Sequence, residues 1–100
     1  MTITIEGLLT ETPRYGAAPD GNYVVTLRAG DGCGHPFEAR VPCGSGPSAA
    51  IDAQRLAQSM RTGDRCVMSG QCVRFVNDHD IARFVLSMPE RVEVAGRAVL

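Results

Sequence analysis

The sequence has no tryptophan, no lysine and only five aromatic residues among its 100 positions. Each base stacked on an aromatic ring adds about 1 to 3 kcal/mol to single-strand binding, so few stacking platforms are available. All ten basic residues are arginine, which reflects either a GC-rich genome or selection for guanidinium contacts with phosphate. The net charge of −1 disfavours binding of nucleic acid through overall basicity, unless the arginines gather on one face.

Long apolar runs are also missing. No stretch approaches the roughly 18 consecutive apolar residues of a membrane-spanning helix, so we expect no membrane association. Residues 1–6 lack the basic and apolar segments of a secretion signal, so we expect them to start a folded cytoplasmic domain. In that compartment four cysteines are expected to be reduced thiols, with Cys66 and Cys72 packed as small hydrophobic residues.

The first clear pattern is the alternation of a half-buried β-strand. Residues 2–10 place Ile3 and Ile5 on one face and polar side chains on the other. Gly7, in the middle of this segment, predicts a bulge or a sharp bend. Residues 11–22 contain two prolines and two glycines and predict a long loop.

Two further strands are expected at residues 23–28 and 37–42, and Pro42 is expected to end the second of them. Alternation separates an inward face from an outward face in each strand. The inward positions are Tyr23, Val25 and Leu27 in one strand, and Phe37, Ala39 and Val41 in the other.

An amphipathic helix is predicted next, because apolar residues recur at helical spacing. These residues are Ala49, Ala53, Leu56, Ala57 and Met60. Gly63 is expected to end the helix as its C′ residue.

The chain closes with two more predicted strands. One covers residues 65–71 and extends toward Phe75, and a polar turn follows at 77–80. The last strand covers residues 81–94 and is expected to be broken or bulged near Met88 and Pro89.

This order predicts a mainly all-β chain with one domain over residues 1–100: a five-stranded OB-fold Greek-key barrel with one α-helix between strands 3 and 4. A barrel of this kind binds nucleic acid or partner loops across strands 2 and 3. The loops after strands 1 and 4 flank that face.

Specific motifs occur in the same order. They are Gly-Leu-Leu-Thr-Glu-Thr-Pro-Arg-Tyr at 7–15 with Gly21 and Val-Thr-Leu at 25–27, the third-strand segment 37–44, Met-Arg-Thr-Gly-Asp-Arg at 60–65, and Val-Met-Ser-Gly at 67–70. Together they resemble the bacterial single-stranded-DNA-binding protein family, including its primosomal replication protein N-like members. The resemblance covers about residues 3–95.

The resemblance implies binding of single-stranded DNA, or RNA, without sequence preference, in replication, recombination or repair. It also implies a homodimer or homotetramer, replication proteins such as those of the primosome as partners, and association with the nucleoid. Neither an enzymatic activity nor a cofactor is expected.

Four arginines are candidates for phosphate contacts: Arg14, Arg28, Arg40 and Arg74. Arg14 stands in the first long loop, and its alternative role is that of a solvated loop residue or a subunit contact. Arg28 and Arg40 share the polar face of neighbouring strands, where Arg74 could join them to line a groove. The alternative is a solvated sheet face with Glu38 as the counter-charge.

Three aromatic residues are candidates for base stacking: Tyr15, Phe37 and Phe75. Phe37 shares its alternation with Ala39 and Val41, so a place in the core is an equal alternative. Tyr23 and Phe84 are expected in the core.

Two polar clusters suggest other chemistry. Cys33, His35 and Cys43 have zinc-ligand side chains, but no paired motif supplies a fourth ligand and we predict no metal site. Asp78, His79 and Asp80 resemble an acid–base group, but no nucleophile or phosphate loop accompanies them and a turn explains them.

A second class of function remains open. The acidic pI of about 6.0 and the scarce aromatic residues favour an OB-fold module for protein interaction or assembly, with little or no affinity for nucleic acid. Salt-dependent binding of an oligonucleotide separates the two classes.

Overall fold

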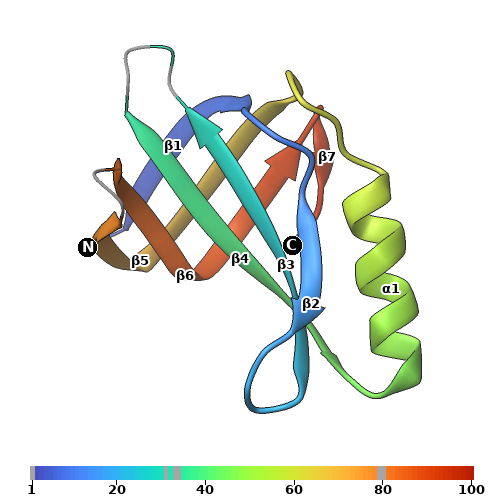
Figure 1. Ribbon diagram of the computed structural model, residues 1–100. Helices are drawn as coiled ribbons and strands as arrows, with labels where there is room; N and C mark the ends of the chain where they lie inside the picture. Colours follow the sequence, from blue (N-terminus) through green and yellow to red (C-terminus); the bar gives the residue numbers. More distant parts are fainter. Residues whose placement is uncertain (1, 31, 33–34, 79–80) are drawn as a thin grey trace.

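A computed structural model describes residues 2–30, 32, 35–78 and 81–100, and their side chains except those of 72–78, 81–82 and 87. Within these residues the chain forms seven strands and one helix (Figure 1). Their bounds are β1 (Ile3–Leu9), β2 (Arg14–Ala17), β3 (Asn22–Gly30), β4 (Pro36–Ser45), α1 (Pro47–Gln58), β5 (Arg65–Asp78), β6 (Ile81–Val94) and β7 (Arg97–Ala98). The prediction of a mainly β fold with one helix is confirmed for the described residues.

The strands form one sheet with the order β1-β5-β6-β4-β3-β2, and β7 pairs with β6. The β4–β6 pair is parallel, and every other pair in this order is antiparallel. β1 also pairs with β3, through Leu8 and Leu9. One strand therefore contacts both β5 and β3, and the β3–β4 pair lies in front of β1 and β5 in Figure 1.

The core lies between these strands and the helix. The predicted inward positions of β3 and β4 are buried: Val25, Leu27, Phe37, Ala39 and Val41. Tyr23 is half-buried and packs against the core, and Cys66 is buried within it, as predicted. Phe84 is 43% exposed, so its prediction as a core residue is wrong.

Gly7 is needed for a close approach and not for a bulge. β1 pairs with β5 in unbroken register through this residue, opposite Cys66, so of the two predicted alternatives, a bulge and a sharp bend, the bulge is wrong. A Cβ atom at position 7 would lie 2.1 Å from the carbonyl oxygen of Gly30. The backbones of β1 and β3 meet here with no room for a side chain.

Two strands were not expected from the sequence. β2 lies within the predicted loop of residues 11–22 and pairs with β3, from Arg14 opposite Thr26 to Ala17 opposite Tyr23. Its sequence, Arg-Tyr-Gly-Ala, carries no apolar alternation, and all four residues are exposed. β7 forms a hairpin with β6 through a turn in which Ala95 and Gly96 both have positive φ.

β4 continues past Pro42, contrary to the predicted end of that strand. Tyr23 pairs with Gly44 and Val24 pairs with Pro42, which leaves Cys43 as an extra residue in β4. This β-bulge lets the strand continue to Ser45 after the proline.

The helix begins after Gly46, with Pro47 in its first turn, where the missing N–H of proline costs no helical hydrogen bond. Ala49, Ala53 and Ala57 form its buried stripe, and their small side chains let the helix axis lie close to β2, β3 and β4. The helix ends at Gln58, so Gly63 is not its C′ residue. The N–H of Gly63 instead donates to the carbonyl of Leu9 at 2.8 Å, which ties the turn after the helix to β1.

The β5–β6 hairpin shows the predicted irregularity near Met88 and Pro89. The register shifts at Gly70, which lies opposite Pro89, and again on either side of Cys72. A Cβ atom at Gly70 would lie 3.1 Å from the carbonyl oxygen of Met88, so the strands are closely spaced there. β5 runs to Asp78, three residues past Phe75, so the first two residues of the turn predicted at 77–80 belong to the strand instead.

Among the described residues, no helix combines the length and the apolar character needed to cross a membrane.

Candidate functional site

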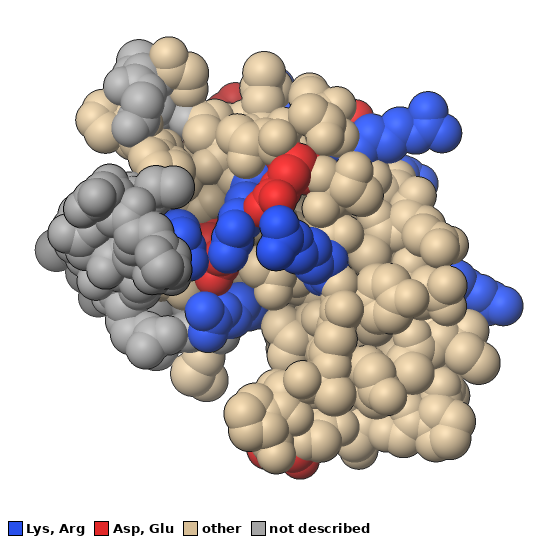
Figure 2. Space-filling model, viewed as in Figure 1, with Lys and Arg blue, Asp and Glu red and all other residues tan. Residues whose placement is uncertain are grey.

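The candidate site is the outer face of β3 and β4. Alternation that buries Val25, Leu27 and Ala39 directs the intervening side chains away from the core. On this outer face Arg28 lies opposite Glu38, and Thr26 lies opposite Arg40. Basic and acidic side chains of the described surface gather over this pair of strands (Figure 2).

Glu38 is the centre of this group. Its side chain is only 1% exposed although it lies on the outer face of the sheet, because arginines cover it. Arg28 Nε donates to Oε1 at 2.9 Å and Arg40 Nε donates to Oε2 at 3.1 Å. Arg83 of β6 places its Nε 3.5 Å from Oε1. Each carboxylate oxygen therefore faces at least one guanidinium group.

Glu11 extends the group toward β2. Its Oε1 lies 3.4 Å from Arg28 Nη1, and its Oε2 accepts a hydrogen bond from Arg14 Nη2 at 3.1 Å. The hydrogen bond to Glu38 is the largest of the effects that raise the pKa of the Arg28 guanidinium, which therefore stays charged. We call Arg14, Arg28, Arg40, Arg83, Glu11 and Glu38 the arginine cluster; four cations and two anions give it a net charge of +2.

The cluster's cations differ in their access to solvent. Arg14 and Arg40 have side chains that are 69% and 43% exposed, whereas the Arg83 side chain is mostly buried. Among the described residues, each of Arg14 and Arg40 uses one nitrogen in its ion pair, and a guanidinium carries five N–H donors, so further donors can contact a ligand. These two residues are the best placed to contact an anion from solution.

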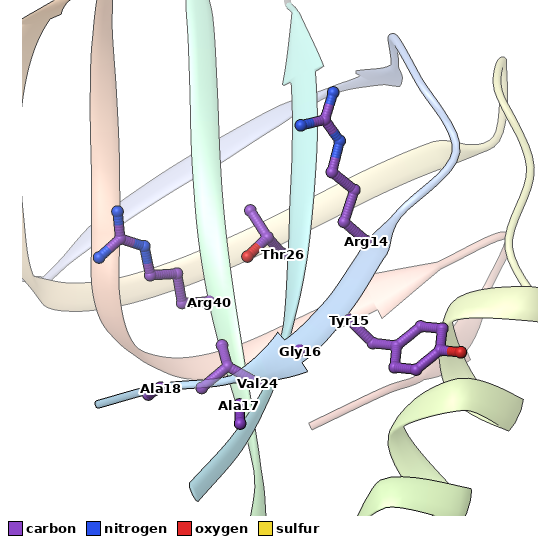
Figure 3. Close-up of a pocket in the computed structure, with 8 residues that line it drawn as sticks. All are labelled: Arg14, Tyr15, Gly16, Ala17, Ala18, Val24, Thr26 and Arg40. Atoms are coloured by element: carbon purple, nitrogen blue, oxygen red, sulfur yellow. The ribbon is translucent and has the colours of Figure 1, made fainter. Parts of the chain in front are cut away.

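A groove of about 320 Å³ lies between these two arginines. Its lining is Arg14, Tyr15, Gly16, Ala17, Ala18, Val24, Thr26 and Arg40. In Figure 3 the side chains of Arg14 and Arg40 lie on two sides of the groove, and Thr26 and Val24 lie between them. The floor of the groove is built from small side chains, which allows a flat group to approach the backbone.

Tyr15 does not share this face. Alternation along β2 sends its ring to the side opposite Arg14, toward α1, as Figure 3 shows. The ring is about half exposed, so it remains a surface aromatic. The structure therefore separates the two predicted loop contacts and places both on a strand.

The other predicted contacts have three outcomes. Arg28 and Arg40 lie together as expected, although their counter-charge Glu38 is buried and not solvated. Phe37 is 2% exposed within the core, so its alternative role is correct and no base can stack on it. The backbones of Arg74 and Phe75 lie in β5, but their side chains are outside the described residues.

Sequence reasoning missed Arg83 and Glu11. Arg83 joins the cluster because β6 runs parallel to β4 at this point, and a parallel pair of distant strands leaves no local signal. Glu11 could have been predicted as a partner of Arg14, since it lies three residues before it in the sequence. The available signal was an acidic residue close to an arginine in the sequence.

His35 and Cys43, the two described residues of the predicted zinc-ligand group, lie far apart. His35 precedes β4 and Cys43 lies near its other end, so eight residues of extended chain, roughly 26 Å at about 3.3 Å each, separate them. No group of three metal-binding side chains occurs among the described residues. Cys33, His79 and Asp80 lie outside the described part of the chain, as does the side chain of Asp78.

Cys66 is expected to be unreactive in the folded protein. Burial raises the pKa of its thiol to about 11, so only about one molecule in a thousand carries the thiolate at pH 8. Iodoacetamide at pH 8 should leave Cys66 unmodified in buffer and alkylate it in urea, with peptide mass mapping as the readout. Cys43 is half-buried and should react faster. Equal rates at the two positions would contradict this placement.

A scan against models of protein families finds no match to this chain, and a search of curated proteins finds none either.

Proposed function

We propose that this protein binds single-stranded nucleic acid along the outer face of β3 and β4. The observation that carries the proposal is the arginine cluster, which gathers basic side chains on one face despite an overall charge of −1. Local charge of this kind attracts phosphates even where the whole molecule is slightly acidic. The resemblance of the sequence motifs to bacterial single-stranded-DNA-binding proteins supports the same function.

An OB-fold-like barrel is part of this proposal. The pairing of β1 with both β5 and β3 supports it, because these contacts link the two sides of the sheet. Five strands would form the barrel: β1, β3, β4, β5 and β6. The arginine cluster then lies on the face that OB-folds use for strands of nucleic acid.

Single strands fit the groove better than duplexes. The floor of small side chains allows the flat face of a base to approach, and base faces are exposed only in unpaired strands. Besides the two arginines, the lining residues with polar side chains are Thr26 and Tyr15, and the Tyr15 ring points away, so little sequence preference is expected. Tyr15 points away and Phe37 is buried, so among the described side chains phosphate contacts carry more of the proposed binding than stacking does.

The resemblance to single-stranded-DNA-binding proteins also supports proposals on localisation, oligomeric state and cellular process. We infer a cytoplasmic protein associated with the nucleoid, a homodimer or homotetramer, and a role in replication, recombination or repair. DNA is the proposed ligand, and RNA is an alternative because both carry the same phosphate chain.

Fluorescence anisotropy with labelled oligo-dT tests the proposal. We expect a Kd on the order of micromolar at about 50 mM salt. Three phosphate contacts, to Arg14, Arg28 and Arg40, predict a roughly 20-fold loss of affinity between about 50 and 200 mM salt. Arg40→Ala should weaken binding about fivefold at the lower salt and reduce the salt slope by roughly one contact.

Arg91→Ala is the matched control, because Arg91 is an exposed arginine that pairs with Glu93 on another part of β6. It removes the same charge and should change the Kd less than twofold. Absence of saturable binding by the unmodified protein at low salt would favour the competing class, a module for protein interaction or assembly. The paired state of the cluster's arginines is the observation that keeps this second class open.

A further inference from the structure

Glu11 is the more exposed acid of the arginine cluster, and the role inferred for it below rests on the proposed function. Glu11 lies between β1 and β2, where one carboxylate oxygen faces Arg14 and the other faces Arg28. The two oxygens of a carboxylate resemble the two non-bridging oxygens of a phosphodiester in charge and in hydrogen-bonding capacity. Glu11 therefore occupies the position in which a phosphate would contact these arginines.

The two acids of the cluster differ in how easily they can leave. Glu38 is 1% exposed and is held by Arg28 and Arg40 through hydrogen bonds to both oxygens. Glu11 is 32% exposed, and its partner Arg14 is mostly in solvent. An exposed ion pair contributes at most about 1 kcal/mol, so Glu11 can rotate into water at low cost.

We propose that Glu11 is a built-in competitor that a phosphate of the bound strand displaces from Arg14 and Arg28. In the free protein Glu11 neutralises these two arginines. When a strand binds, its phosphate takes the place of the carboxylate, and the released side chain becomes hydrated. Arg40 contacts neither oxygen of Glu11 in the described interactions, so it provides the first contact for an approaching strand.

This exchange selects ligands with several linked phosphates. A strand held at Arg40 keeps its next phosphate close to Arg14, at a high effective concentration, and that phosphate competes with Glu11 efficiently. A single nucleotide lacks this advantage and leaves Glu11 in place. The ratio of the affinities for an oligonucleotide and for a mononucleotide should therefore be larger than the difference in their number of phosphate contacts alone predicts.

Glu11→Gln tests the inference, since it removes the charge and keeps the size. In oligo-dT anisotropy at about 50 mM salt we expect about fivefold tighter binding than the unmodified protein, because two exposed ion pairs no longer compete. The salt slope should increase by roughly one contact, since the freed arginines then carry mobile counterions that the strand releases. Competition by thymidine monophosphate should become measurable in this variant only.

Glu93→Gln is the matched control, because Glu93 is 30% exposed, pairs with an arginine, and gives the same change in net charge. It should change the Kd less than twofold. Circular dichroism and thermal unfolding establish that both variants are folded, and Glu11→Ala serves as a second variant if glutamine disturbs the loop.

The outcomes are distinguishable from those of the proposed function. If the unmodified protein binds oligo-dT and Glu11→Gln behaves like Glu93→Gln, or binds more weakly, the competitor role is wrong while the proposed function stands. If neither the unmodified protein nor any variant binds at low salt, the proposed function itself fails. Binding that appears or tightens in Glu11→Gln alone supports the inference.

Discussion

Replacing Gly7 by alanine is expected to unfold the protein at room temperature. The new Cβ atom would lie 2.1 Å from the carbonyl oxygen of Gly30, 2.7 Å from its carbonyl carbon and 3.0 Å from Cε1 of Phe37. The first two atoms are backbone of β3, and the third belongs to a ring buried in the core. Nothing at this position can move aside without separating β1 from β3.

The expected cost is more than about 4 kcal/mol, which falls in the exceptional range for a single substitution. A domain of this size has a free energy of unfolding of about 5 to 15 kcal/mol, so little stability would remain. Urea titration followed by far-UV circular dichroism measures the effect. We expect a midpoint near zero urea, or a protein that is recovered only as aggregates.

Gly16→Ala is the matched control for this prediction. Gly16 also lies in a strand, opposite Val24, but a Cβ atom there meets no atom within 4 Å. Its free energy of unfolding should stay within about 0.5 kcal/mol of the unmodified protein. A Gly7→Ala variant as stable as Gly16→Ala would mean that β1 does not approach β3 as described.

The strands and the helix that bury one face were predictable from the sequence, whereas the role of Gly7 and the strand β2 were not. Alternating apolar residues predicted β1, β3 and β4, and apolar residues at helical spacing predicted the helix, because burial of one face requires a periodic pattern in the sequence. Gly7 was recognised as unusual, but its neighbour Gly30 is brought close by tertiary structure alone. The sequence of β2 shows no such pattern, because β2 pairs with β3 through its backbone and buries none of its side chains.

Part of the candidate site was also predictable from the sequence. Arg28 and Arg40 were predicted to lie together because both have the outward parity on strands expected to be neighbours. Phe37 has the inward parity, and the core alternative followed from that observation. Arg83 depends on the parallel contact of β6 with β4, and such a pairing requires knowledge of the whole topology.

Replacing Glu38 by glutamine is expected to produce the second large effect, a loss of about 2 to 3 kcal/mol of stability. Removing one partner of a buried ion pair costs about 3 to 5 kcal/mol, because the other charge stays buried without compensation. The cost is lower here, since Arg28 and Arg40 are partly exposed and regain water. Glutamine keeps the volume of the side chain, but one end of its amide is an NH2 group. This donor would face the N–H donors of the guanidinium groups, so no hydrogen bond could form there.

The buried side chain of Arg83 keeps the expected loss of stability in Glu38→Gln at about 2 to 3 kcal/mol. Its side chain is only 15% exposed, and its Nε is buried without a hydrogen-bond partner among the described residues. The Glu38 carboxylate, 3.5 Å away, provides the compensating charge. Without that carboxylate, Arg83 would remain a buried cation beside two others, and this repulsion acts only in the folded state.

A double-mutant cycle separates this charge coupling from a general loss of packing. Arg83→Met retains an unbranched apolar side chain and removes the charge. If the carboxylate compensates Arg83, the Glu38→Gln/Arg83→Met double variant should be more stable than the sum of the two single losses by at least about 1 kcal/mol. Urea denaturation of all four proteins supplies the measurement, and strictly additive losses would contradict the coupling. Arg28 and Arg40, two of the proposed phosphate contacts, both donate to the carboxylate of Glu38. Such coupling would therefore mean that Glu38 fixes the positions of these arginines although it does not contact the ligand itself.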